Sequence, residues 1–250
     1  MLLLSVLKVS ACLKVKTGIQ MLQKLSCRPY YIDLIQTDLK KEEHLIKVIV
    51  FDLGGVIVNV KNESETPLYS LFTNYPGGNN TEDLLNSGLL RGFETGRISV
   101  EEFFEEVGGL LNLEISLDDF KRGLNKMIDP GNTGIEEIIK TLSSEYATAL
   151  FSNTNEVHFR YIESHFPIVK SFSHTILSYK IGNVKPDKEA YEKLLSITGY
   201  QAEEHLFIDD RIENISAASE LGIEVILFRS VHQLKKDLNA RGIVQYSNPI

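Results

Sequence analysis

The residues best suited to chemistry follow a short apolar run at 48–51, where Asp52 is followed closely by Gly54 and Gly55. Such a run is typical of a buried strand in a parallel sheet, and the glycine pair allows the backbone to turn sharply after it. The strand would then present one carboxylate at a sheet edge on a rigid scaffold. A carboxylate in that place can act as a nucleophile, a base or a metal ligand.

Three more groups of polar side chains follow apolar runs later in the chain. Ser152 and Asn153 precede an expected helix, and a helix N-terminus offers free N–H groups to a phosphate. Lys185 stands between a glycine loop and a proline. Asp209 and Asp210 are adjacent carboxylates, which repel each other unless a cation or a shared proton offsets the repulsion. Oxygen ligands of this kind favour Mg2+.

The elements that would position these side chains alternate along the chain after residue 45. We expect strands at 47–52, 146–152, 173–177, 205–209 and 224–228, and helices at 134–143, 156–165, 188–198, 213–221 and 231–240. Strands that alternate with helices form right-handed βαβ units. The predicted fold class is therefore α/β, a Rossmann-like parallel sheet with helices on both faces, whose ligands bind beyond the carboxyl ends of the strands.

An insertion of roughly 70 residues separates the first strand from the next βα unit, which is far longer than an ordinary loop. Its polar, helix-like pattern predicts an all-helical cap at 61–130. Ser99 with Glu102 three residues later indicates a helix start. Three polar cap residues would either reach the substrate or form a solvated surface: Arg91, Glu94 and Arg97.

The core domain would comprise 45–60 and 131–250, with residues 1–44 as an N-terminal extension. Residues 1–31 hold five basic side chains, no acidic one and both cysteines. This segment would be a disordered extension, an organelle transit peptide or the product of an upstream start codon. We expect a cytoplasmic protein, in which no disulfide staples the body of the fold.

Composition limits the partners. Residues 32–250 carry 21 basic and 34 acidic side chains, a net charge of -13 that would repel nucleic acid. No apolar run approaches the ~18 residues that a membrane span needs. We therefore expect a small phosphorylated metabolite as partner, no nucleic acid, no membrane, and a monomer or weak homodimer.

Together and in this order, the four motifs resemble the haloacid dehalogenase-like superfamily of hydrolases, most of whose members are phosphatases. The resemblance covers roughly residues 46–230 and includes a helical cap between the first and second motifs. It implies a reaction in two steps, in which Asp52 attacks phosphorus to form an aspartyl-phosphate and water then releases phosphate.

The same resemblance implies a role for each motif residue. Mg2+ would be held by Asp52, by the backbone carbonyl of Gly54 and by Asp210. Lys185 would pair with Asp52 and with the phosphoryl group. The remaining residues would bind the phosphate (Ser152 and Asn153) or orient the groups that touch it (Asp209 and Asn214).

One position departs from the family pattern. Most phosphatases of the family carry a general acid-base two residues after the nucleophile, and this chain has Gly54 there. Loss of a positioned acid lowers a rate by about 10²–10⁴-fold. Either another group or water supplies the proton, or the substrate has a good leaving group, such as an anomeric or acyl phosphate. The chain looks most like a branch with Asp-Leu-Gly in this motif, which includes sugar-1-phosphate phosphatases.

We therefore predict a Mg2+-dependent phosphomonoester hydrolase that acts on a small metabolite, with a sugar phosphate as the leading candidate. The alternative is a catalytically impaired protein of the same fold that binds a phosphate ligand or regulates. Retention of Asp52, Lys185 and Asp210 favours the enzyme, because binding alone does not need a nucleophile. A phosphoprotein phosphatase is the weakest reading, and the missing acid disfavours a mutase. A carbon–halogen hydrolase is disfavoured because that subgroup lacks the glycine pair and does not use Mg2+.

Overall fold

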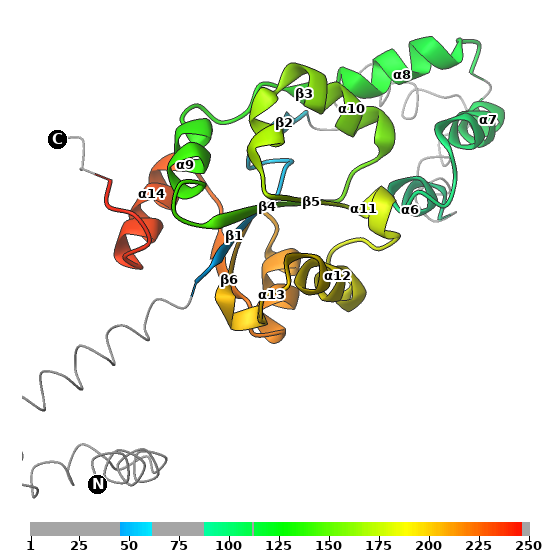
Figure 1. Cartoon of the computed structure of the whole chain (residues 1–250). Coiled ribbons are helices and arrows are strands. Elements are labelled where there is room, and N and C mark those ends of the chain that lie inside the picture. The colour runs from blue at the N-terminus through cyan, green and yellow to red at the C-terminus, as the bar shows by residue number, and fades with distance from the viewer. Residues whose placement is uncertain (1–45, 62–87, 112, 247–250) are drawn as a thin grey trace, which may run out of the picture. The chain divides into compact units, whose positions relative to one another are not determined.

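A computed structural model of the chain describes residues 46–61, 88–111 and 113–246 (Figure 1). The expected N-terminal extension at 1–44 and an expected turn at 77–80 lie outside these residues. Within the described ranges, no helix combines the length and the apolar character that crossing a membrane requires.

The core is a five-stranded sheet in which every neighbouring pair of strands is parallel. The strand order is β5-β4-β1-β6-β7. Their bounds are Val48–Phe51 for β1, Ala147–Ser152 for β4, His174–Leu177 for β5, His205–Asp209 for β6 and Glu224–Leu227 for β7. Because the chain builds outward from β1 first to one side and then to the other, β1 lies at the switch point where α/β sheets bind ligands.

Helices cover both faces of this sheet, as predicted. One face carries α9 (Ile135–Leu142), α10 (Glu156–His165) and α14 (Val231–Ala240), and the other carries α12 (Lys188–Thr198) and α13 (Ile212–Glu220). Figure 1 shows α9 and α10 on one side of the sheet, with α12 and α13 on the opposite side. Each predicted core strand and helix begins and ends within one residue of the observed bounds, which confirms the α/β fold class.

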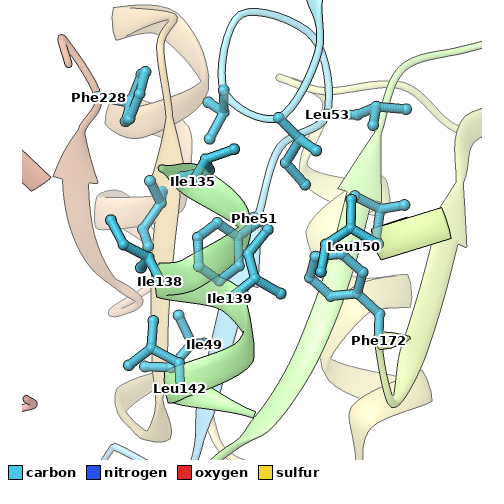
Figure 2. Packing of buried hydrophobic residues seen from close by; sticks show 14 of the residues in the cluster. Ile49, Phe51, Leu53, Ile135, Ile138, Ile139, Leu142, Leu150, Phe172 and Phe228 are labelled. Atoms are coloured by element: carbon cyan, nitrogen blue, oxygen red, sulfur yellow. The ribbon is translucent and has the colours of Figure 1, made fainter. Parts of the chain in front are cut away.

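Alternation along the buried strands explains why both faces are covered. Ile49 and Phe51 of β1 point into the cluster beneath α9, whereas Val48 and Val50 point into the cluster beneath α12 and α13. Figure 2 shows four apolar side chains of α9 packed against Ile49, Phe51 and Leu150 (the four are Ile135, Ile138, Ile139 and Leu142). Their spacing of three and four residues places them on one helix face.

The described part of the cap contains three helices, α6 (Leu89–Glu94), α7 (Val100–Leu111) and α8 (Leu117–Asn125). They share a small apolar cluster in which Phe93 and Phe103 stack at 4.4 Å between ring centroids. The predicted start of α7 is confirmed, since Ser99 N donates to Glu102 at 2.7 Å and Glu102 N donates to Ser99 Oγ at 3.2 Å.

The expectation of an all-helical insertion needs one correction at its base. Two short strands, β2 (Asn59–Val60) and β3 (Ile128–Asp129), pair antiparallel where the chain leaves and re-enters the core. The Asn59 amide also donates to Pro130 O at 2.9 Å. Strands of two residues leave no alternating pattern in a sequence, so pattern reasoning does not detect them.

Candidate active site

Asp52 emerges from the middle of the sheet. Phe51 lies opposite Leu150 on β4 and Ile208 on β6, so the next residue leaves the sheet between the ends of those strands. The ladder continues one step further, because Asp52 N donates to Ile208 O at 2.9 Å. The Asp52 side chain is therefore fixed by the sheet itself, and the residue is only 7% exposed.

The Lys185 ammonium is the centre of the site. It donates to Asp52 Oδ1 at 2.7 Å, to Asp209 Oδ2 at 2.7 Å and to Phe151 O at 2.9 Å. The rings of Phe151 and Phe207 lie 5.1 and 5.2 Å from it. Burial opposes a charged lysine, but the two carboxylates outweigh burial and raise its pKa. Lys185 is thus a permanent cation held against Asp52.

Asp209 is fully buried, and both of its oxygens already have partners. Apart from Lys185, it accepts from the Arg211 backbone N–H at 2.8 Å and from the Asn214 amide at 3.0 and 3.1 Å. Asn214 is held in turn by the Tyr191 hydroxyl, which donates to Asn214 O at 2.8 Å. This network positions the lysine and already engages both Asp209 oxygens with donors of the protein.

Asp210 lies against the turn that follows Asp52. Gly55 has φ +77°, and a Cβ built on it would lie 2.2 Å from Asp210 Oδ2. Only a glycine tolerates both the left-handed backbone and this close approach. Asp52, Asp209 and Asp210 each offer an oxygen, and these oxygens lie within 4.8 Å of one another. Burial and the Asp209 charge raise the pKa of Asp210.

The charges of the site suit a divalent cation. The site holds three carboxylates and one ammonium, and burial raises the Asp52 pKa to about 6, although Lys185 opposes this and Asp209 adds to it. Within the described ranges, no hydrogen bond reaches the Gly54 carbonyl. Oxygen donors of this kind fit Mg2+. Because Asp209 is fully committed, Asp52, Asp210 and the Gly54 carbonyl are the groups left to hold it.

The residues predicted to bind phosphate, Ser152 and Asn153, stand at the end of β4, and the Asn153 side chain bonds to the lysine loop. Ser152 is buried, and its hydroxyl makes one long contact of 3.3 Å with Asn153 O. The Asn153 side chain accepts from Lys185 N and donates to Lys185 O, both at 2.8 Å. It therefore fixes the lysine loop, and what Asn153 can still offer to a phosphate is its backbone N–H.

Sequence reasoning missed Asn132, which is hydrogen-bonded to the turn that follows Asp52. Its amide donates to Gly55 O and Val56 O, both at 3.0 Å. The neighbouring Gly131 approaches so closely that a Cβ there would lie 1.5 Å from Ile57 O. The turn-forming residues at 130–134 indicate where the chain re-enters the core domain, but they do not indicate which backbone groups the Asn132 amide contacts.

The cap helix α6 is anchored to the loop that carries Lys185. Arg91 forms an ion pair with Asp187, two residues after the lysine. Gly96, with φ +68°, packs so tightly that a Cβ on it would lie 2.3 Å from Tyr179 O, in α11 (Ser178–Ile181). Of the three polar cap residues considered above, Arg91 is thus used in docking and Arg97 donates to Thr95 Oγ1 at 3.0 Å.

A second contact between cap and core runs through His158 on α10. Its Nε2 lies 3.1 Å from Leu124 O at the end of α8, and its Nδ1 lies 3.1 Å from the Asn155 amide. Asn155 is also the N-cap of α10, since it accepts from His158 N at 3.0 Å. Burial lowers the pKa of His158 to about 4, so the ring is neutral and donates from Nε2.

Comparison with known proteins agrees with this geometry. A family described as haloacid dehalogenase-like hydrolase matches residues 49–228. Among curated proteins, D-ribitol-5-phosphate phosphatase of Bacteroides thetaiotaomicron is 26% identical over 186 residues, which are 72% of this chain and 90% of that protein. Flavin mononucleotide hydrolase 1 of Arabidopsis thaliana, a chloroplast protein, is 30% identical over 60% of this chain and 61% of its own length.

Solved structures give the same picture. A family enzyme of Bacteroides thetaiotaomicron, crystallised with magnesium and inorganic phosphate, has a TM-score of 0.66 and 26% identity over 74% of this chain and 96% of that one. A hydrolase from Porphyromonas gingivalis has a TM-score of 0.68 and 26% identity over 80% of this chain and all of that chain.

Proposed function

This chain belongs to the haloacid dehalogenase-like hydrolases and is a phosphatase, and we propose that it uses Mg2+ and an aspartyl-phosphate on Asp52 to hydrolyse a small phosphorylated metabolite. The observation that carries this proposal is the buried Lys185 ammonium, which bridges Asp52 and Asp209 at 2.7 Å each. Asp52 is thereby paired with a cation, as an attacking carboxylate requires.

The first step forms a bond between an Asp52 carboxylate oxygen and phosphorus. The bond from phosphorus to the leaving oxygen breaks, and that oxygen takes up a proton. In the second step water attacks phosphorus, which releases inorganic phosphate and restores Asp52. Lys185 stabilises negative charge in both steps, because it stays protonated and its position is fixed by Asp209 and Asn153.

The phosphoryl group would lie between the ends of β1 and β4. Ser152 and the backbone N–H of Asn153 would bind its oxygens there. Asp52, Asp210 and the Gly54 carbonyl would hold Mg2+, which when bound supplies positive charge to the phosphoryl oxygens. Gly55 permits this arrangement because a larger residue would displace the Asp210 carboxylate.

A sugar or sugar-alcohol phosphate is the substrate class we favour. Two curated relatives are named for small phosphorylated metabolites, ribitol 5-phosphate and flavin mononucleotide. Ribitol 5-phosphate is an ester of a primary alcohol, so the preference for anomeric or acyl phosphates that Gly54 suggests is one option and not a requirement. The cytoplasmic location, the lack of nucleic-acid partners and the monomeric or weakly dimeric state stay predictions.

The test is phosphate release by the full-length protein from a panel of phosphorylated metabolites, with Mg2+ and with chelator. We expect Mg2+-dependent release from sugar or sugar-alcohol phosphates, and none from the Asp52→Asn variant. Release that persists in that variant would rule out the covalent mechanism. If the wild type released no phosphate yet gained thermal stability from the same ligands, the alternative of a phosphate-binding protein would hold.

A further inference from the structure

The glycine at position 54 leaves the proposed reaction without a proton donor for the leaving group. A Cβ at this position would lie 3.1 Å from Val60 Cγ2, so the space beside it is bordered by β2. The carboxylates at the strand ends cannot serve, because Asp209 is fully hydrogen-bonded and Asp52 and Asp210 are assigned to nucleophile and metal. A donor other than water must therefore come from another element.

Nearby carboxyl groups on the rim are mostly engaged. Asp187 is paired with Arg91, and Glu213 accepts from Arg211 Nε at 2.7 Å. Glu94, the last residue of α6, differs from both. It is half-buried, and within the described residues its carboxyl group makes neither a hydrogen bond nor an ion pair. A half-buried carboxyl group with no protein partner is well suited to contact a ligand.

The helix that carries Glu94 is docked beside the loop that carries Lys185. It is fixed on both sides of Glu94, by the Arg91–Asp187 ion pair before it and by the contact of Gly96 with Tyr179 after it. The guanidinium groups of Arg211, which directly follows Asp210, and of Arg91 both favour the charged form of Glu94. Glu94 thus stands on a cap helix that is fixed against the lysine loop.

We propose that Glu94 protonates the leaving oxygen of the substrate, the task that residue 54 cannot perform. This inference rests on the proposed phosphatase function. As the bond from Asp52 to phosphorus forms, the electron pair of the breaking bond passes to the leaving oxygen, and the Glu94 O–H delivers its proton there. The resulting carboxylate then takes a proton from the water that attacks the aspartyl-phosphate, which restores the acid.

The electrostatics of Glu94 suit both halves of this cycle. Burial raises its pKa, while Arg211 and Arg91 oppose that rise. Burial thus increases the protonated fraction that the first step needs. After proton transfer, the two guanidinium groups stabilise the carboxylate that the second step uses as a base.

The test compares two leaving groups in the full-length protein. For Glu94→Gln, we expect turnover of an alkyl phosphate such as ribitol 5-phosphate to fall by about 100-fold or more, the usual effect of losing a general acid. Turnover of p-nitrophenyl phosphate, whose phenolate leaves without a proton, should stay within about 3-fold of the wild type, since protonation is not needed. The matched control is Glu106→Gln, an exposed glutamate on α7, which should alter neither.

Each other result overturns the proposal. Equal loss on both substrates would assign Glu94 to binding or positioning, and unchanged turnover on both would exclude it from the reaction. Retained p-nitrophenyl phosphate turnover also shows that the variant is folded. Failure of the proposed function would look different, because the wild type itself would then release no phosphate from either substrate.

Discussion

The carboxylate of Asp209 and the ammonium of Lys185 lie 2.7 Å apart, and both side chains are almost completely shielded from solvent. Asp209 is itself fixed by Asn214 and by the Arg211 backbone N–H. The position of the lysine relative to Asp52 is therefore set by a carboxylate whose two oxygens both accept hydrogen bonds from the protein. Catalytic geometry and folding stability depend here on the same ion pair.

Asp209→Asn should reduce both stability and turnover. Removing one partner of a buried ion pair costs about 3–5 kcal/mol, and Lys185 would keep only Asp52 as a charged partner. We expect the free energy of unfolding, measured by urea denaturation at pH 7.5, to fall by about 3 kcal/mol. Glu137→Gln removes an exposed ion pair with Lys235 and should cost less than about 1 kcal/mol. Equal losses in the two variants would contradict the role given to Asp209.

Asp52→Asn should reduce the pH dependence of stability in the metal-free protein. Burial raises the Asp52 pKa from 3.8 to about 6, so the folded protein binds the proton more tightly than the unfolded chain. This contribution is present below pH 4 and is lost as pH rises through 6, a change of about 3 kcal/mol. With chelator present, the wild type should therefore lose more stability than the variant between pH 4 and pH 7.5.

The same comparison at pH 4 provides the control, since Asp52 is then largely protonated in the folded protein. The difference in unfolding free energy between variant and wild type should change by about 3 kcal/mol in favour of the wild type as pH falls from 7.5 to 4. A difference that is independent of pH would show that charge burial at Asp52 is not its cause.

Much of this site could be predicted because its chemistry follows short buried strands. Apolar runs that end in Asp52, Ser152 and Asp209 indicate parallel strands, and parallel strands bring their carboxyl ends to one edge. The start of helix α7 after Ser99 could also be predicted, since a capping box is a local sequence pattern. These features depend on residues that are neighbours in the sequence.

Other features depend on tertiary placement and left no local pattern. The Arg91–Asp187 ion pair joins residues 96 positions apart, and the contact of His158 with Leu124 O joins residues 34 apart. The Asn153 side chain bonds to the lysine loop, 32 residues further along the chain. The hydrogen-bond and ion-pair partners of these polar groups depend on how the cap and the loops pack in the folded protein.

Gly55→Ala should weaken the response to Mg2+. The added Cβ would lie 2.2 Å from Asp210 Oδ2 and must displace that carboxylate. We expect the Mg2+ concentration that gives half-maximal phosphate release to rise by about tenfold or more, which corresponds to losing roughly 1.4 kcal/mol of binding. Gly199→Ala is the matched control, because it has φ +78° but nothing within 4 Å of the added atom. Equal effects would assign the loss to backbone strain alone.

His158 should make the wild type sensitive to acid. Burial lowers its pKa from 6.5 to about 4, so the unfolded chain binds the proton more tightly. The stability linked to this ring is present above pH 6.5 and is lost as pH falls toward 4, by about 3 kcal/mol. His158→Gln, whose amide can still donate to Leu124 O, should lose less stability between pH 7.5 and 4.5.

Thermal unfolding of both proteins across this pH range measures the effect. His165→Gln serves as the control, because that histidine is exposed on the same helix. An identical loss of stability at low pH in the wild type and in His158→Gln would show that protonation of the His158 ring does not weaken the contact between cap and core.

The most direct test of the account is to trap the intermediate. The full-length protein is mixed with a substrate from the metabolite panel and Mg2+, quenched in acid within milliseconds, and digested for mass spectrometry. We predict that one phosphoryl group is found on the peptide containing Asp52 and is absent from Asp52→Asn. Phosphate release without any phosphorylated Asp52 peptide, or a phosphoryl group on another residue, would contradict the mechanism.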